Sequence, residues 1–384
     1  MKLKLIIWYL VTFGVTLNYC MLPRDWYYGR ELNFTSVASI ATGGVELFEP
    51  SAVMPNPLSI SRPKFIFSGA YQLGMLGERR TRFVFDQYDN TVGEIAIAEN
   101  NSLYGQIGQF AFLLPTPLLN LEFTTAPAIN YHYYFYREFR DDFYTLIATE
   151  EVRLSGILYK SSLILGRQWC NKFGFAFGPI YFFGSRDYHY YRSAVLNNPD
   201  IIIDTPGAPW GWGYTCKISY TPIEKLSATL YYTSSTTLKD FIRGQTAVYY
   251  PWSVRLNLCY LASGEIPTKL GAFASYTNWQ RLNINNFNKV LNLGIGIEHT
   301  LLNMVALRYG FRIEPSFTKP TVICAVFTAG WGFEVSSMKL DVGAEIGRRE
   351  LYPEHFLYIT DTDRIYQNIV TILGGLKVPI ELPW

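Results

Sequence analysis

The residue types that could carry out chemistry are scattered along this 384-residue chain. The four histidines lie far apart and follow no spacing that is typical of metal ligands, such as HExxH. They are His132, His189, His299 and His355. The carboxylate pairs Asp141–Asp142 and Glu150–Glu151 are sequence neighbours, and neighbours on a strand point to opposite faces, so neither pair predicts an acid–base dyad. No GxSxG or P-loop motif is present, and we expect no enzyme, no metal site and no cofactor.

The composition favours a membrane barrel over a soluble enzyme. Charged residues make up 17% of the chain, against roughly 25% in soluble proteins. Tyr (29), Phe (26) and Trp (9) are abundant, and such rings are typical of the interfacial belts of membrane barrels. The five cysteines form no CxxC pair, which favours a packing role over a metal site or a disulfide. The net charge of +2, without a block of Lys and Arg, predicts no nucleic-acid partner.

The N-terminus is typical of a secretory signal peptide, which we assign to residues 1–20. Lys2 and Lys4 precede an apolar run from Leu5 to Leu17, which is shorter than the roughly 18 residues of a helical membrane span. Cys20 is an alternative site of lipid attachment, but the bulky Tyr19 before it disfavours lipidation. No later apolar run reaches the length of a spanning helix, so the sequence predicts no helical membrane span.

The secondary-structure elements that carry these residues are predicted from apolar and polar side chains that alternate every two residues. In "LNLGIGIEHT", Leu291–Thr300, Leu and Ile alternate with Asn, Gly and Glu. Such alternation predicts a strand with one apolar and one polar face, in either a soluble sandwich or a membrane barrel. The same period recurs in Trp212–Tyr220, Ser253–Tyr260, Val305–Glu314, Thr328–Val335 and Leu340–Gly347.

The lengths of the connections favour the barrel. Short connections near residues 221, 262, 300 and 336 alternate with longer ones over 235–251, 278–289 and 348–364. An outer-membrane barrel has short turns at its periplasmic end and longer loops outside, whereas a sandwich has no physical reason to sort its loops. About nine segments after residue 211 and about five before it predict an all-β, antiparallel transmembrane β-barrel of roughly 14 strands, within a range of about 12 to 16.

The barrel is assigned to residues 63–384, and residues 21–62 are predicted to form an N-terminal plug in its lumen. The plug lacks long alternation, and its stretch "ATGGVELFEPSAVMPNPLSISR" contains a Gly pair and three prolines, which suit a compact irregular segment. A barrel of this size would leak unless something filled its lumen. A flexible periplasmic tail is the alternative.

Charged residues on the polar faces of the strands are expected to point into the lumen. An Arg that faces lipid at the membrane midplane costs about 2–4 kcal/mol. The mixed signs predict a salt-bridged lining that braces a plug, because a selective ion filter would show one sign. The predicted lumen-lining residues are Lys217, Arg255, Arg308, Arg312, Glu334, Asp341 and Glu345.

Several short motifs resemble one family of outer-membrane proteins. "ASIATGG" at 38–44 followed by Asn56-Pro57, the hairpin "GYTCKISYTPIEKLSATLYYTSS" and the strand "LDVGAEIGRRE" are similar to segments of the long-chain fatty-acid transporter (FadL-type) superfamily, including its PorV-like relatives. The resemblance implies a fourteen-stranded barrel with an N-terminal hatch and, in the transporter branch, passive uptake of hydrophobic molecules. It also implies that hatch residues contact the substrate, or alternatively only pack against the inner wall. These residues are Leu47, Phe48, Met54, Asn56, Pro57 and Leu58, the last where a small residue is usual.

The sequence therefore leaves three functions open. The first is passive uptake of fatty-acid-like hydrophobic molecules across a bacterial outer membrane, with outer-membrane lipid and the barrel assembly machinery as partners. The second is a non-transporting, PorV-like scaffold or shuttle for protein secretion. The third is a soluble secreted β-sandwich, which would bury Leu293, Ile295 and Ile297 between two layers and expose Arg308 and Glu345 to solvent.

Overall fold

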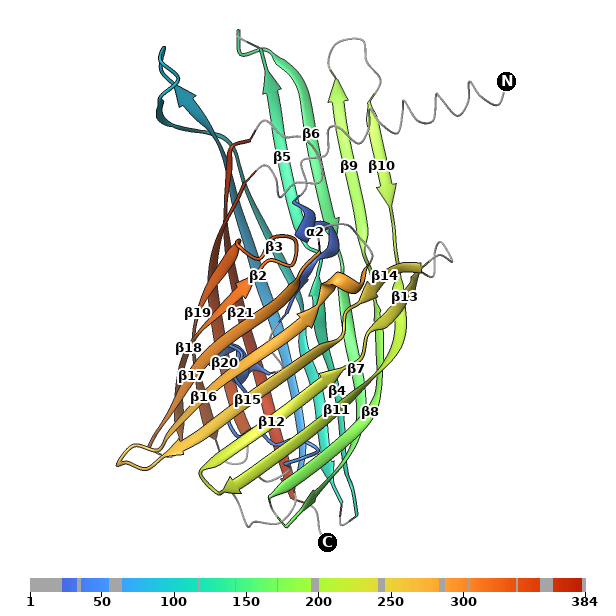
Figure 1. Ribbon diagram of the computed structural model, residues 1–384, viewed down its shortest axis with the longest axis vertical. Coiled ribbons are helices and arrows are strands. Elements are labelled where there is room, and N and C mark those ends of the chain that lie inside the picture. The colour runs from blue at the N-terminus through green and yellow to red at the C-terminus, as the bar shows by residue number, and fades with distance from the viewer. Residues whose placement is uncertain are drawn as a thin grey trace, which may run out of the picture.

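The fold is taken from a computed structural model of the chain. The structure describes residues 23–32, 36–54, 64–116, 118–141, 143–170, 172–194, 200–240, 246–282, 287–302, 304–335, 338–352 and 362–381. Within these residues, fourteen strands form a closed antiparallel barrel, in agreement with the predicted number (Figure 1). The barrel closes because β21 pairs with β2 in continuous register from Lys64↔Glu381 to Thr81↔Arg364.

The barrel strands follow the order of the chain, so each pairs with its neighbours in the sequence of barrel strands. They are β2 (Lys64–Phe85), β3 (Thr91–Pro115), β4 (Asn120–Asn130), β7 (Ile157–Trp169), β8 (Phe173–Gly184), β11 (Pro209–Ile223), β12 (Leu226–Thr233), β15 (Ser253–Ala262), β16 (Thr268–Asn278), β17 (Lys289–Leu301), β18 (Val305–Pro315), β19 (Ile323–Val335), β20 (Met338–Leu351) and β21 (Arg364–Glu381).

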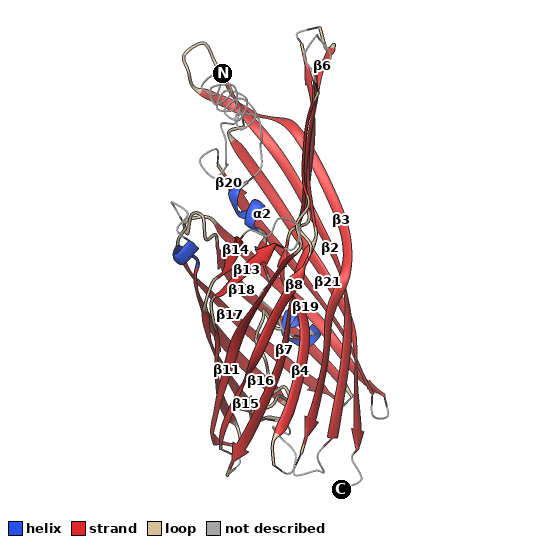
Figure 2. Cartoon of the chain, turned by 90° about the vertical axis from the view of Figure 1, so that its right-hand side faces the viewer, coloured by secondary structure: helices blue, strands red, loops and turns tan. Residues whose placement is uncertain are grey.

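Further strands extend the wall at one end of the barrel. A separate four-stranded sheet contains β5 (Tyr133–Arg140), β6 (Leu146–Ser155), β9 (Asp187–Ala194) and β10 (Ile201–Thr205), all labelled in Figure 1. Figure 2 shows β6 projecting at the same end of the molecule. A hairpin of β13 (Thr236–Asp240) and β14 (Thr246–Tyr250) joins β12 to β15, and the 3-10 helix η1 (Trp279–Leu282) follows β16. The opposite end, where the C-terminus lies in Figure 1, carries short turns such as the one between β11 and β12.

The apolar faces of the strands point outward, away from the lumen. Leu293 and Ile295 are 44% and 59% exposed, whereas Arg308 and Glu345 are 2% and 1% exposed. This distribution is the reverse of the one that a soluble sandwich requires, and it leaves a wide apolar outer surface suited to hydrocarbon. In the described part of the chain, no helix combines the length and the apolar character needed to cross a membrane.

In the first half of the chain, strand-like stretches of sequence do not correspond one to one with barrel strands. "KFIFSGAYQ" at 64 and "RFVFDQY" at 82 both contribute to the single strand β2. "NYHYYFYREF" at 130 contributes β5 to the separate sheet and not to the barrel. At this end of the molecule Phe135 of β5 and Val152 of β6 lie in an internal apolar cluster.

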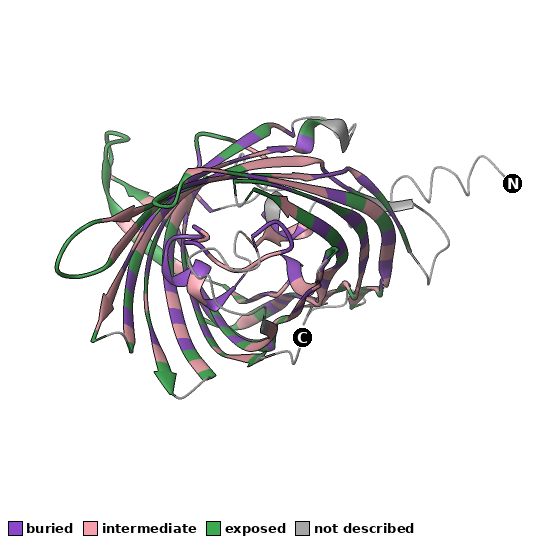
Figure 3. Cartoon of the chain, turned by 90° about the horizontal axis from the view of Figure 1, so that it is seen from below, coloured by how far each residue is buried: buried purple, intermediate pink, exposed green. Residues whose placement is uncertain are grey.

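The N-terminal segment, residues 23–32 and 36–54, lies inside the ring of strands in the view along the barrel (Figure 3). It contains α2 (Arg24–Tyr28), β1 (Arg30–Glu31) and α3 (Val37–Ala41). Helix α3 begins at Ser36 because the Ser36 hydroxyl accepts from the Ser39 amide while the Ser39 hydroxyl accepts from the Ser36 amide. It ends before Gly43 and Gly44, which adopt positive φ angles of 68° and 96°.

Candidate functional site in the barrel lumen

Two glycines on the inner face of the wall, Gly296 and Gly310, let the N-terminal segment lie directly against the strands, and we call them the glycine floor. A Cβ atom at Gly296 of β17 would lie 2.2 Å from the Thr42 carbonyl oxygen, and one at Gly310 of β18 would lie 2.4 Å from the Gly43 amide nitrogen. Gly43 also donates from its amide to the Thr328 hydroxyl of β19 at 2.8 Å. The glycines on the polar faces of these strands therefore permit backbone-to-backbone contact with the N-terminal segment.

An ion-pair network ties β1 to the wall. Arg30 lies 3.2 Å from a Glu314 carboxylate oxygen and 3.4 Å from one of Glu345. Arg312 contacts the same two carboxylates at 2.6 and 2.5 Å. Two guanidinium groups thus balance two buried carboxylates, which is the arrangement that charges removed from water require.

The predicted lumen-lining residues take several partners. Arg308 bridges Glu298 and Asp341, each at 2.6 Å, and Lys217 lies 2.5 Å from Glu122. The Glu122 carboxylate in turn accepts from the Ala52 amide at 2.7 Å, and Arg255 donates to the Gly44 carbonyl. These contacts and those of Arg312 and Glu345 lie on the inner side of the wall.

Glu334 is the exception among the predicted lumen residues, because its side chain is exposed near the short-turn end of β19. Sequence reasoning also missed Glu298 and Glu122. Glu298 lies on the polar face of the alternating strand that begins at Lys289, so its signal was present. The alternation around Glu122 is too irregular to assign a face.

The hatch residues that the structure describes pack against the wall. Leu47 and Phe48 form an apolar cluster with Val45, Cys259 of β15 and Phe273 of β16. Met54 is buried, and its backbone bridges to Ser51 through bonds of 3.0 Å in both directions. The other three predicted hatch residues, Asn56, Pro57 and Leu58, lie outside the described residues.

A cavity of about 230 Å³ lies between the N-terminal segment and strands β2, β3, β4, β7 and β11. Part of its lining is apolar and includes Leu32, Ile66, Phe112, Pro127 and Ile164. The rest carries charges of both signs, from Glu31, Glu46, Glu122, Lys160, Lys217 and Arg255. Burial raises the pKa of Glu31 to about 7, although the nearby Lys160 ammonium acts in the opposite direction.

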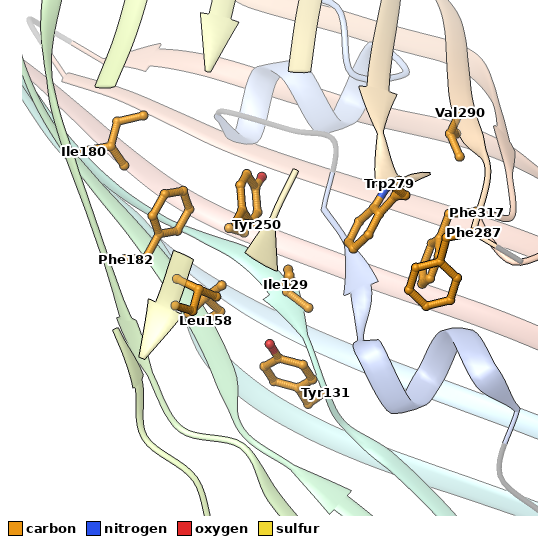
Figure 4. Packing of buried hydrophobic residues seen from close by; sticks show 12 residues of the cluster. Ile129, Tyr131, Leu158, Ile180, Phe182, Tyr250, Trp279, Phe287, Val290 and Phe317 are labelled. Atoms are coloured by element: carbon orange, nitrogen blue, oxygen red, sulfur yellow. The ribbon is translucent and has the colours of Figure 1, made fainter. Parts of the chain in front are cut away.

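An aromatic cluster lies next to this cavity. Figure 4 shows Phe182, Tyr250 and Trp279 among the residues that gather from different parts of the wall. The rings of Trp279 and Phe317 stack with centroids 4.3 Å apart. Ile180 and Tyr250 belong to the cluster and also line the cavity, so the two regions are continuous. Apolar surface of this kind suits an apolar solute that leaves water.

The barrel wall is interrupted between β3 and β4. These strands pair only from Phe110↔Thr125 to Pro115↔Asn120, whereas β4 continues to Asn130 while paired with β7. We call the interval between β3 residues 105–109 and β4 residues 126–130 the wall gap. Gln109, Ala126 and Pro127 on its edges line the cavity, so the cavity reaches the gap from inside.

The N-terminal segment pairs with the part of the β4 edge that β3 does not pair with. Arg30 and Glu31 of β1 pair with Asn130 and Ile129, and the Leu32 amide donates to the Ala128 carbonyl at 3.0 Å. The register between β4 and β7 shifts between Pro127 and Ile129. A proline and a bulge are features that let a strand bend away from its neighbour.

The wall gap is closed at both ends. At the end nearer the turn that joins β3 to β4, Phe110 pairs with Thr125. At the other end, the Tyr104 ring of β3 stacks on His132 with centroids 4.6 Å apart. There the Tyr136 amide of β5 also donates to the Asn100 side chain at 2.9 Å. The interval without backbone pairing between β3 and β4 is therefore bounded at both ends.

Other candidate chemistry is not assembled in the described part of the chain. There, no group of three or more His, Cys, Asp and Glu side chains could hold a metal ion. His189 Nδ1 lies 2.5 Å from a carboxylate oxygen of Asp204 on the outer face of the separate sheet, which is a local hydrogen bond. The cysteines that the structure describes, Cys170, Cys216, Cys259 and Cys324, are free thiols.

Comparison with known proteins shows the fold. No family model matches the sequence, and no curated protein matches it. A FadL homologue of Pseudomonas aeruginosa is 11% identical with a TM-score of 0.60, covering 92% of this chain and 99% of that one. The toluene transporter TodX of P. putida is 13% identical with a TM-score of 0.62, covering 92% and 99%. The toluene transporter TbuX of Ralstonia pickettii is 12% identical with a TM-score of 0.60, covering 91% and 99%. The barrel fold expected from the sequence motifs is thereby confirmed.

Proposed function

We propose that this chain is an outer-membrane β-barrel that mediates passive uptake of hydrophobic small molecules. The observation that carries the proposal is the wall gap, with a partly apolar cavity directly behind it. The similar structures include a FadL homologue and transporters of toluene, which is an apolar molecule. The outward apolar faces of the strands support placement in a bacterial outer membrane.

The physical course of uptake follows from the order of surfaces along the lumen. An apolar solute gains free energy when it leaves water for the aromatic cluster around Trp279 and Tyr250. The adjoining cavity leads to the wall gap, through which the solute would pass sideways into the membrane without crossing the aqueous periplasm. The N-terminal segment then acts as a plug that prevents a continuous water-filled pore.

Charged side chains of the wall hold the plug in place through ion pairs and hydrogen bonds. Arg30 joins it to Glu314 and Glu345, and Ala52 joins it to Glu122. Because these groups are buried and paired, a free ion that entered would have to replace existing partners. We infer that the lumen discriminates against small ions while apolar solutes use the remaining surface.

The test is uptake of the hydrophobic fluorophore N-phenyl-1-naphthylamine by Gram-negative cells that produce the protein. Ser68 of β2 borders the cavity and lies on the same strand face as the buried Gln72, so Ser68→Phe places a ring in the cavity. We expect wild-type cells to take up the dye several-fold faster than Ser68→Phe cells. The control is Gly93→Phe, which adds a ring in open space near the tip of β3. Equal rates for wild type and Ser68→Phe would contradict the proposal.

The second candidate function is a non-transporting scaffold for protein secretion. It is favoured by the separate sheet of β5, β6, β9 and β10, whose β10 edge pairs on one side only among the described strands. An ordered extension of this kind offers a surface for a partner outside the membrane. Dye uptake that is no faster with the wild-type protein than without it would favour this function.

A further inference from the structure

Arg167 of β7 faces the membrane instead of the lumen. Gly166 before it points inward, because a Cβ atom there would lie 2.6 Å from the Ala52 carbonyl oxygen of the N-terminal segment. Arg167 therefore points outward, on the face that carries Leu165 and Trp169, which are 51% and 43% exposed. Arg167 is exposed as well, and no described residue forms an ion pair with it.

The strand register places Arg167 on the hydrocarbon side of an aromatic girdle. Trp169, Phe173 and Tyr220 lie directly opposite one another on β7, β8 and β11, at the short-turn end where the C-terminus lies in Figure 1. Such rings are typical of the level of the lipid headgroups. The row that pairs Arg167 with Phe175 comes next, about 7 Å along the strands toward the hydrocarbon. A cation thus lies one row inside the girdle.

An arginine at this position gains from an anion at the membrane surface. A lipid-facing Arg costs about 2–4 kcal/mol at the midplane of the membrane and about 0–1 kcal/mol near its surface. The Arg167 side chain is therefore stabilised when it extends along the wall toward the headgroups. The anion at that level is the phosphate of a phospholipid, which a guanidinium group binds through two parallel hydrogen bonds.

Lys172 supplies a second cation at the same part of the rim. The turn from β7 to β8 is tight, because the Lys172 amide donates to the Trp169 carbonyl at 3.0 Å. The Lys172 carbonyl accepts from the Thr221 amide at 2.7 Å, which fixes this turn against the end of β11. Lys172 is exposed and has no ion-pair partner among the described residues. Arg167 and Lys172 thus flank Trp169, one on the strand and one in the turn.

The surroundings of the two cations suit a phospholipid. The neighbouring turn from β11 to β12 contains Glu224, but Lys225 follows it and balances its charge, and the turn from β3 to β4 on the other side has no acidic residue. Farther toward the hydrocarbon, Leu163, Leu165 and Phe177 offer exposed apolar surface for acyl chains. Cations beside an apolar membrane-facing surface are a feature of lipid-headgroup sites.

From these observations we infer that Arg167 and Lys172 form a binding site for the phosphate of an anionic phospholipid in the periplasmic leaflet of the outer membrane. The Arg167 guanidinium binds the phosphate from the hydrocarbon side, and the Lys172 ammonium binds it from the rim. An anionic lipid is favoured over a zwitterionic one, because the amine of a zwitterionic headgroup would bring a third cation to the site. The site lies on the outside of the barrel and is independent of the proposed uptake.

Native mass spectrometry of the detergent-solubilised protein tests this site. The lipid probes are phosphatidylglycerol, phosphatidylethanolamine and diacylglycerol with the same acyl chains, and inorganic phosphate alone is the fourth probe. We expect phosphatidylglycerol to bind most tightly. Arg167→Leu should weaken this binding about ten- to hundredfold, which is the factor that one charge-assisted hydrogen bond allows. Arg167→Lys keeps the charge and should weaken it less.

The matched control is Arg153→Leu, which removes an exposed arginine from β6 of the separate sheet. It should bind phosphatidylglycerol like the wild type. Equal binding by the wild type and Arg167→Leu would overturn the site, and so would an equal loss in Arg153→Leu, because that would indicate unspecific attraction between charges. Binding of any of the other three probes as tightly as phosphatidylglycerol would also contradict it. Heat-modifiable migration in detergent gels checks that each variant is folded.

Discussion

Adding one methyl group to the glycine floor is expected to lift the N-terminal segment from the wall. In Gly296→Ala the new Cβ would lie 2.2 Å from the Thr42 carbonyl oxygen, which is backbone and cannot rotate away. Overpacking of this kind costs about 1–3 kcal/mol. Thr42 must move, and the bond from the Gly43 amide to Thr328 weakens with it.

The magnitude converts directly into hydrogen exchange. A loss of about 1–3 kcal/mol in docking corresponds to exchange that is about 5- to 100-fold faster, at tenfold per 1.4 kcal/mol. The amides to follow are that of Gly43, which donates to the Thr328 hydroxyl of the wall and to the Ile40 carbonyl, and that of Gly44, which donates to the Ser39 carbonyl. The assay is hydrogen–deuterium exchange read by mass spectrometry on peptides that cover α3 and the turn after it. Heat-modifiable migration in detergent gels checks that the barrel itself remains folded.

The control is Gly69→Ala, which adds the same methyl group on the outer face of β2, the face that also carries the exposed Tyr71. No atom lies within 4 Å of an added Cβ at Gly69, so we expect exchange at wild-type rates. Unchanged protection of Gly43 and Gly44 in Gly296→Ala would refute the reasoning. It would mean that the strands yield, and that the glycines do not fix the position of the N-terminal segment.

Three further predictions concern the outer face, the ion pairs and pH. Ile295→Arg places a charge on the lipid-facing side and should lower the free energy of unfolding by about 2–4 kcal/mol, measured by urea titration in vesicles. The control is Val92→Arg, near the tip of β3, which should change this free energy by less than about 0.5 kcal/mol. Arg30→Met leaves buried carboxylates short of a cation and should weaken β1 docking by about 3–5 kcal/mol, seen as faster β1 exchange that Glu314→Gln partly restores in the double variant. Because the pKa of Glu31 is raised from 4.5 to about 7, docked β1 holds this proton more tightly than released β1. Docking should therefore be strongest below about pH 4.5 and weaken as the pH rises to about 7, and Glu31→Gln should remove this dependence when exchange is corrected for its intrinsic rate.

The barrel was predictable because strand faces are encoded locally. In the segment from Leu291 to Thr300, alternation with a period of two residues places Ile295 on the face opposite Glu298 whatever the strand pairs with, and the loop lengths indicated that the Ile295 face is the outer one. The same local rule predicted buried positions for Arg308 and Glu345, and it gave the correct number of barrel strands even where the bounds differed. The FadL-type resemblance led to the same fold.

The site was predictable only in part. The charges of Arg308 and Arg312 were assigned to the inner face, but their partners were not, because an ion pair depends on the register between strands. The contribution of Arg30 carries no local signal, since β1 has two residues and lies outside the alternating pattern. The same is true of Glu31, which lines the cavity from the N-terminal segment.

Sequence alone thus determined which side of each strand meets lipid, because the two-residue period separates the two faces and the loop lengths favour a barrel. The wall gap was decided only by the tertiary structure, because β4 can pair with β3 or with β1 and the choice depends on chain segments far apart in sequence. A local pattern fixes the direction of a side chain, whereas the strand that lies beside it is fixed by the competition between distant partners for the same hydrogen-bonding edge.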